Sequence, residues 1–193
     1  MQSYGKIEVT GADMIAISAH KIYGPKGIGA LWVRDGIELD PQITGGLQEQ
    51  DVRSGTLSTA LVAGFGAAAK EARERMEQDA AHAEELWTLA RDMFASNWAL
   101  NGDEDTRIHA NLNVRRKGLD VARLMSECRD VMFSAGSACA SGSGRPSHVL
   151  KAIGLSDKQA KNSIRLGFGR YTTLYEIEEA ARLINEAAEE QGL

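Results

Sequence analysis

The sequence predicts an α/β fold in which strands and helices alternate along most of the chain. Short apolar runs bounded by glycine-rich turns, such as residues 12–18 and 29–34, are typical of strands. Helix-capping residues at Ser58 and Thr173 precede segments with helical spacing. At 193 residues and 43% hydrophobic content, the chain is long enough to bury a substantial core. Alternating elements of this kind indicate a layered α/β architecture.

The first half of the chain begins with two strands. Only residues 21–27 turn between the strand at 12–18 and the strand at 29–34, so there is no room for a crossover helix, and the strands are antiparallel if they pair. Residues 35–55 are irregular and rich in glycine. From Ser58 the pattern predicts a helix that runs toward Ser96, with weak points at Gly64 and Gly66. We expect a domain boundary near residue 76, which divides the chain into domains 1–75 and 76–193.

The second half continues the alternation. We expect a strand around 108–114, a helix from Asp120 to about Cys128 and a strand at 131–133 that enters a loop of small residues. Pro146 suits the first turn of a helix that Gly154 ends, and 163–167 is a further strand. A capping box at Thr173 opens the last helix. Four apolar residues on one face should pack that helix onto a sheet: Ile177, Ala181, Ile184 and Ala188.

Composition excludes several classes of function. The formal net charge is -5, which disfavours binding to nucleic-acid phosphates. No apolar run approaches the length needed to span a bilayer, and the N-terminus lacks the apolar core of a signal peptide, so no membrane role and a cytoplasmic location are expected. Cys128 and Cys139 form neither a disulfide framework nor a CxxC metal pair, which predicts a reduced compartment and no metal site.

Two stretches carry residues suited to chemistry. Ser18-Ala-His-Lys21 stands where the first strand ends, which is where α/β folds gather ligand groups. An ordinary polar strand end is the alternative, and the glycines that follow precede a strand rather than a helix, which argues against a nucleotide triphosphatase. Cys139 lies in a run of serine, alanine and glycine that we expect to be a mobile loop. A flexible linker with an incidental thiol is the alternative there, and Cys128 is expected to be structural.

Four motifs in order resemble cysteine desulfurases of the class V aminotransferase group. The segment from Ser18 to Leu31 resembles their cofactor-lysine segment, and the one from Gly45 to Thr56 resembles a conserved glycine loop. Gly136-Ser-Ala-Cys139 resembles the catalytic-cysteine loop, and Ser163-Ile-Arg165 the strand that binds the substrate carboxylate. The resemblance implies the C-terminal portion of the large domain of a fold-type I transferase that depends on pyridoxal 5'-phosphate, plus an α/β small domain.

The resemblance also implies roles around pyridoxal 5'-phosphate. Lys21 would form the Schiff base, while Ser18 and His20 would bind the cofactor phosphate. Gln2 falls beside the phenolic oxygen, and Thr56 would reach the cofactor of a homodimer partner. These residue types suit the task, because an aldehyde requires an amine, and hydroxyl and imidazole groups suit a phosphate dianion.

The implied reaction transfers sulfur from L-cysteine to the protein. Arg165 would bind the substrate carboxylate, and Cys139 would take the sulfur as a persulfide, releasing alanine. A sulfur-acceptor or scaffold protein would then receive it, for iron–sulfur clusters or other sulfur-transfer pathways. A loop of small residues would allow Cys139 to move between cofactor and acceptor.

The family protein is roughly twice as long as this chain, so the resemblance implies a fragment or half of a split enzyme. The carboxylate that pairs with the cofactor's ring nitrogen would precede Gln2, and activity of this chain alone is therefore in doubt. Two alternatives remain open. One is another class V aminotransferase or a selenocysteine lyase, and the other is a non-catalytic module that binds a sulfur-acceptor protein.

Overall fold

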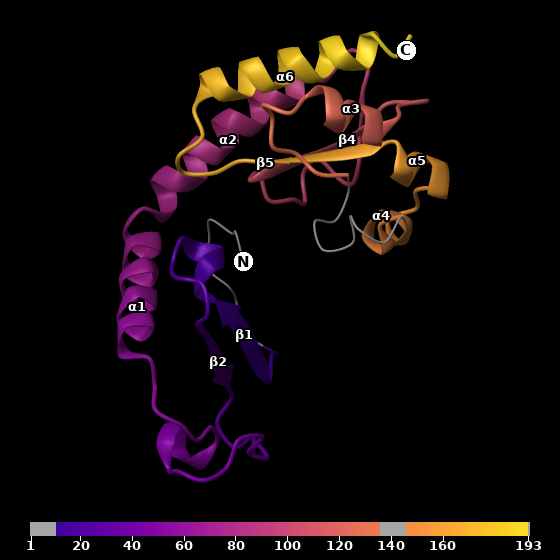
Figure 1. The fold of residues 1–193 in the computed structure, drawn as a ribbon. Helices are drawn as coiled ribbons and strands as arrows, with labels where there is room; N and C mark the ends of the chain where they lie inside the picture. Colours follow the sequence, from indigo (N-terminus) through magenta and orange to yellow (C-terminus); the bar gives the residue numbers. More distant parts are fainter. Residues whose placement is uncertain (1–10, 136–145, 193) are drawn as a thin grey trace. The chain divides into compact units, whose positions relative to one another are not determined.

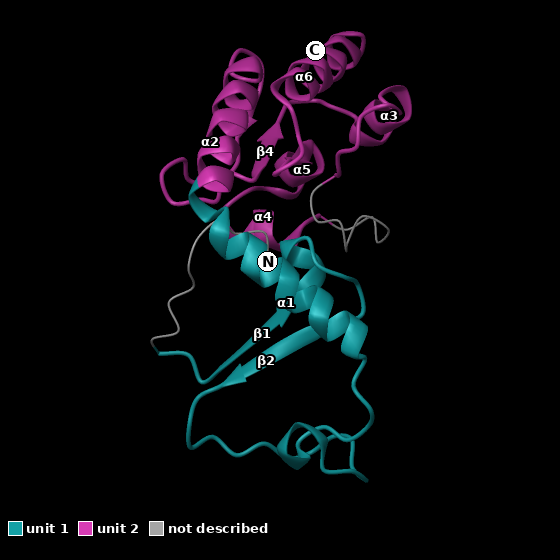
Figure 2. Ribbon diagram, turned by 90° about the vertical axis from the view of Figure 1, so that its left-hand side faces the viewer, with its two compact units in different colours: residues 1–77 teal, residues 78–193 magenta. Residues whose placement is uncertain are grey.

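The computed structural model describes residues 11–135 and 146–192, which form two compact units. Unit 1 comprises residues 1–77 and unit 2 residues 78–193 (Figure 2). Each unit is described by itself below. The fold is mixed helix and strand, as the sequence predicts. Within the described ranges, no helix combines the length and the apolar character that crossing a bilayer requires.

Unit 1 contains a two-stranded sheet. Strand β1 (Met14–Ser18) pairs with β2 (Gly29–Val33), and the two are antiparallel, which confirms the prediction from the short turn. The chain does not remain extended after Ser18, because Ala19–Ile22 forms a single 3-10 turn, η1. A second short 3-10 segment, η2 (Gln48–Asp51), interrupts the irregular stretch that follows β2.

Helix α1 (Thr59–Glu74) follows Ser58 and packs on the turn between the two strands. A side chain at Gly64 would meet the ring of Pro25 at 3.1 Å, so this glycine allows close packing rather than weakening the helix. The prediction of a single helix that runs toward Ser96 is wrong. It breaks at Arg75, whose φ of -100° and ψ of 5° are not helical, and α2 (Met76–Met93) begins anew.

Unit 2 is built on a three-stranded antiparallel sheet in the order β3-β4-β5. Its strands are β3 (Ala99–Leu100), β4 (Asn111–Arg115) and β5 (Ser163–Gly167). Alternate residues give β4 and β5 one apolar face, on which Leu112 pairs with Leu166 and Val114 with Ile164. All four side chains are buried. Helices α2 and α6 (Leu174–Glu189) cover this face (Figure 1).

The last helix confirms two predictions. The side chain of Thr173 accepts a hydrogen bond from the amide of Glu176, and the Glu176 carboxylate accepts one from the amide of Thr173, which completes the capping box. The four predicted apolar residues of α6 are all buried in the core of unit 2. Helix α3 (Val121–Glu127), capped by Asp120, adds Val121 and Leu124 to the same core.

Three short elements differ from the prediction. Residues 131–133 are not a strand, and only an isolated bridge joins Ser134 to β5. Pro146 lies outside helix α4 (His148–Ala152), which Ser147 caps. Helix α5 (Asp157–Lys161) was not predicted, because five residues show no hydrophobic periodicity, although its Ser156–Gln159 capping box is visible in the sequence.

Candidate functional site

The turn that carries Lys21 is held by backbone contacts and by small residues. Ala19 is fully buried, its carbonyl accepts a hydrogen bond from the amide of Gly24, and its own amide donates to Ile28. A side chain at Gly24 would collide with Ala19 and with Ala68 of α1. Tyr23 closes the turn with a left-handed φ of 64°. The backbone of the Lys21 turn is therefore fixed between the sheet and α1.

The three candidate site side chains of this turn are available to a ligand. Ser18 precedes η1, but its hydroxyl makes no capping hydrogen bond. His20 and Lys21 are exposed, and neither side chain makes a hydrogen bond or ion pair with any residue that the structure describes. A hydroxyl, an imidazole and an amine are thus held on one rigid turn, and all three are free to contact a ligand. Because η1 is helical, His20 and Lys21 do not point to opposite sides as neighbouring residues on an extended strand would.

The glycine loop before α1 is organised around a buried serine. Ser54 is only 4% exposed. Its hydroxyl donates a hydrogen bond to the carbonyl of Gly46 and accepts one from the amide of Gly46. The side-chain oxygen of Gln48 accepts from the amide of Gly55 at 3.0 Å. These bonds close the loop, and Thr56 follows at its end with an exposed side chain.

The tip of that loop adopts an uncommon backbone. Three consecutive residues that are not glycine, Glu49–Asp51, have φ values of 52°, 58° and 66°. Residues with a Cβ in this region cost free energy, and such strain is concentrated at functional positions. The loop that resembles a family motif is thus also the most strained described segment of unit 1.

Arg165 lies in the middle of β5, on the polar face of the sheet in unit 2. Its cross-strand partner is Asn113, and the neighbouring pair on this face is Arg115 and Ser163. Asn101, which is buried, donates to Asn113 and to the hydroxyl of Ser163, so polar side chains are organised around this face. Arg165 is half-buried.

The backbone of Arg165 also holds the segment that leads toward Cys139. The Ser134 amide donates to the Arg165 carbonyl at 3.0 Å, and the Arg165 amide donates to the Ser134 carbonyl at 2.8 Å. Cys139 itself lies outside the described residues, as does Gln2. The structure therefore brings the start of the cysteine loop beside Arg165, and it brings Ser18, His20 and Lys21 together on one turn in the other unit.

Cys128 has the environment of a structural thiol. It is buried in the core, and its sulfur contacts the carbonyl of Leu183 at 3.6 Å. Burial, with smaller effects from the carboxylates of Glu127 and Glu190, raises the pKa of the thiol. Because the thiolate is the reactive form, a raised pKa makes Cys128 a poor nucleophile, in agreement with the prediction.

Arg170 forms a buried ion pair that the sequence does not indicate. Its guanidinium forms a bidentate ion pair with Asp79, in which Nη2 donates to Oδ2 at 2.6 Å and Nε donates to Oδ1 at 3.2 Å. The side chains are only 5% and 4% exposed. The pair joins the start of α2 to the segment after β5, 91 positions apart in the sequence, so no local pattern could have indicated it.

Comparison with known proteins identifies the family of this chain. Residues 2–180 match the family described as aminotransferase class-V. The chain belongs to the class V aminotransferase family. Among curated members, it is 44% identical over 196 residues to the cysteine desulfurase IscS of Rickettsia typhi, covering 95% of this chain and 47% of that protein. It is also 44% identical to the cysteine desulfurase IscS of Colwellia psychrerythraea, covering 96% and 48%.

Solved structures of this family have a similar fold. A NifS-like protein from Rickettsia africae superposes with a TM-score of 0.79 at 26% identity, over 95% of this chain and 50% of that one. The structure of SspA in complex with cysteine gives a TM-score of 0.68 at 35% identity, over 89% and 49%. The chain thus spans about half the length of the class V relatives that it matches.

Proposed function

We propose that this chain supplies the cofactor lysine and the sulfur-accepting cysteine of a cysteine desulfurase. The observation that carries the proposal is the backbone bridge between Ser134 and Arg165. It anchors the start of the Cys139 loop beside the candidate carboxylate-binding arginine. Ser134 and Cys139 are five positions apart, so the chain between them spans at most roughly 18 Å. This limit allows the thiol to approach a substrate held at Arg165.

The Lys21 turn fits pyridoxal 5'-phosphate. The amine of Lys21 makes no ion pair with a described residue that would have to be broken before it reacts with an aldehyde. The hydroxyl of Ser18 and the imidazole of His20 are available to a phosphate. When bound, the pyridine ring withdraws electrons from the amino acid attached to it. Packing of α1 against Gly24 would keep the lysine in position during turnover.

Arg165 and Cys139 would act on the substrate. The planar guanidinium of Arg165 would bind the carboxylate of L-cysteine through paired hydrogen bonds. The Cys139 thiol would take the substrate sulfur, so that thiol plus cysteine gives protein persulfide plus alanine. In this exchange a sulfur–sulfur bond replaces the carbon–sulfur bond, and a proton occupies the vacated position on carbon. No external oxidant is required.

The remaining assignments extend the same proposal. Gln2 would contact the phenolic oxygen of the cofactor, and Thr56 would reach the cofactor phosphate of a homodimer partner. The strained backbone of the loop before Thr56 supports a role for Thr56 in contacting the partner subunit's cofactor. The persulfide would be delivered in the cytoplasm to an acceptor or scaffold protein, including one that builds iron–sulfur clusters.

The test compares the two cysteines in a protein that unites this chain with the N-terminal half implied by the resemblance. Cys139→Ser should abolish alanine release from L-cysteine, by at least 100-fold, and should leave binding of pyridoxal 5'-phosphate unchanged because the thiol acts after the cofactor is bound. Cys128→Ser is the matched control and should retain activity. Alanine formation and persulfide labelling are the measurements.

Other outcomes would favour the alternatives. Loss of activity in Cys128→Ser, with Cys139→Ser active, would show that the wrong sulfur was chosen. Transamination or selenocysteine cleavage that survives in Cys139→Ser would indicate another class V aminotransferase or a selenocysteine lyase. Binding of an acceptor protein without any alanine formation in the intact protein would indicate a non-catalytic module.

A further inference from the structure

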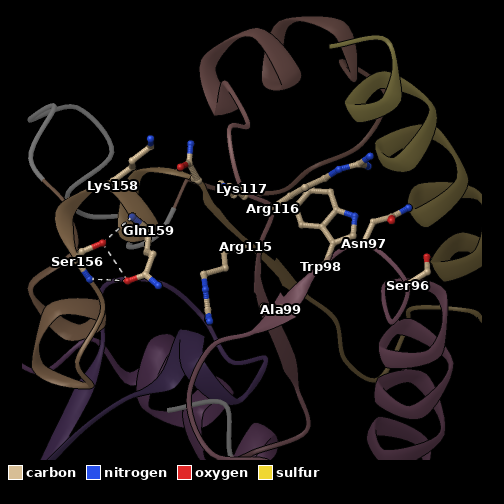
Figure 3. Close-up of a pocket in the computed structure, with 11 residues that line it drawn as sticks. Ser96, Asn97, Trp98, Ala99, Arg115, Arg116, Lys117, Ser156, Lys158 and Gln159 are labelled. Atoms are coloured by element: carbon tan, nitrogen blue, oxygen red, sulfur yellow. Dashed lines mark hydrogen bonds between the residues drawn. The ribbon is translucent and has the colours of Figure 1, made fainter. Parts of the chain in front are cut away.

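Unit 2 contains a pocket of about 800 Å³ that the proposed reaction does not use. Its volume falls in the range of small-molecule sites, roughly 300–1,000 Å³. It is lined by residues from the segment after α2, from β3, from the end of β4 and from α5, and Figure 3 shows Trp98 on one side of it with Ser156 and Gln159 on the other.

The charge of the pocket is strongly one-sided. Four of its lining residues are cationic, namely Arg115, Arg116, Lys117 and Lys158, and none of its lining residues is aspartate or glutamate. The whole chain carries a net charge of -5, so composition does not explain this concentration of positive charge. The nearest carboxylate in sequence on α5, Asp157, is already paired with Lys151, which lowers the pKa of that carboxyl. Cations gathered around one cavity create a favourable potential for an anion.

Two of the cations are fixed in the wall of the pocket. The buried guanidinium of Arg116 lies 6.0 Å from the ring centre of Trp98, and the indole of Trp98 donates to Asn185 at 2.8 Å. Arg115 donates to the carbonyl of Leu100 and to the side-chain oxygen of Asn101. These contacts hold both positive charges in place before any ligand arrives, which reduces the entropy lost on binding.

The other two cations are available to a ligand. Lys117 and Lys158 are exposed, and neither forms an ion pair with a residue in the described ranges. The side-chain oxygen of Gln159 accepts hydrogen bonds from the amide and the hydroxyl of Ser156, so its NH₂ group remains as a donor. The pocket thus combines two fixed charges, two mobile ammonium groups and a neutral donor.

We propose that this pocket binds a compact polyanion of the oligophosphate class. Four cations around one cavity match a ligand that carries several negative charges on a few atoms. An extended acidic peptide fits less well, because side chains on one face of a strand are roughly 7 Å apart and their charges would be spread beyond the pocket. The site lies on the unit that carries Cys139, and it is independent of the lysine turn in unit 1.

Calorimetric titration of the chain with inorganic pyrophosphate tests the proposal. Pyrophosphate should bind, its affinity should fall as salt is raised, and the double variant Lys117→Gln with Lys158→Gln should bind at least tenfold more weakly. The double variant Lys70→Gln with Lys161→Gln removes the same charge from exposed positions outside the pocket and should change the affinity less than twofold. Circular dichroism verifies that each variant is folded.

Four results would overturn the proposal. The first is the absence of pyrophosphate binding in the unaltered chain. The second is equal weakening in the two double variants, which would show attraction by overall charge alone. The third is loss of binding in His20→Ala but not in the pocket variant, which would place the anion on the Lys21 turn. Tighter binding of a hexaglutamate peptide than of pyrophosphate, lost in the pocket variant, would replace the small anion with an acidic protein segment.

Discussion

Lys21 owes its position to residues that have almost no side chain. Ala19 is buried beneath the turn, and Gly24 permits α1 to approach within van der Waals contact. The side chain of Lys21 makes no hydrogen bond or ion pair within the described part of the chain, so replacing it should alter chemistry without altering structure. In unit 1, the residues proposed to carry the chemistry are therefore different from the residues that hold the turn in place.

The first prediction at this scale concerns the covalent site of the cofactor. When the chain is united with the N-terminal half of a cysteine desulfurase relative, incubated with pyridoxal 5'-phosphate and reduced with borohydride, peptide mapping should find the label at Lys21. Lys21→Ala should lose the label completely. Lys26→Ala is the matched control, because Lys26 is an exposed lysine on the same turn, and it should keep the label. A label found at Lys26, with Lys21 unmodified, would sink the assignment.

Candidate site residues could be grouped from the sequence where they are neighbours in the chain. Ser18, His20 and Lys21 are adjacent in the chain, so a short motif was sufficient to group them. The four cations of the pocket were not predicted as a group. Arg115, Arg116 and Lys117 are consecutive, but Lys158 joins them only because α5 packs beside the end of β4. Lys158 lies beside the other three cations because of the tertiary fold, and no sequence motif indicates that position.

At the scale of elements, two kinds of prediction had different outcomes. The capping box of α6, its buried face and the antiparallel pairing of β1 with β2 follow from neighbours in sequence, and these predictions are confirmed. The break at Arg75 was missed, since no glycine or proline marks it. Strand β3 was missed as well, because two residues are too few to show alternation.

The ion pair between Asp79 and Arg170 gives a prediction about how α2 is attached to unit 2. Arg170→Met should lower the free energy of unfolding by about 3–5 kcal/mol, because it leaves the buried carboxylate of Asp79 without the cation that faces it. Replacing both residues, Asp79→Leu with Arg170→Met, should recover much of the loss. Denaturant unfolding followed by circular dichroism measures these differences.

Arg182 provides the control for that experiment. It pairs with Glu179 and Glu186 on the exposed surface of α6, where solvent screens the charges, so Arg182→Met should have little effect on stability. Similar losses in Arg170→Met and Arg182→Met would contradict the distinction between the buried and the exposed pair.

At the scale of the whole molecule, the two units differ in how much they bury. Unit 2 has a continuous apolar core that includes α2, α3, α6 and the sheet. Among residues 11–77, only Ala19 and Ser54 are buried. Both faces of the β1–β2 sheet expose large apolar side chains, with Met14 and Leu31 on one face and Ile17 and Trp32 on the other. Unit 1 therefore has too little core to account for its own stability.

This difference predicts that a polypeptide of these 193 residues self-associates. Exposed strand edges and apolar faces promote contacts between copies, so size-exclusion chromatography should show a dimer or larger species. Met14→Gln with Leu31→Gln should shift the elution toward the monomer. Tyr171→Gln, at an exposed position of unit 2, should leave the elution unchanged. A sharp monomer peak from the unaltered chain would be incompatible with the prediction.

The exposure of the β1–β2 sheet also gives the protein an optical reporter. Of its three tryptophans, Trp32 is 41% exposed, whereas Trp87 and Trp98 are 7% and 5% exposed. A collisional quencher such as acrylamide will reach mainly the indole of Trp32, whose emission is shifted to the red by water. Any protein segment that covers this sheet will remove the quenchable fraction and shift the emission to the blue. The covering of unit 1 can thus be followed by fluorescence in real time without an added label.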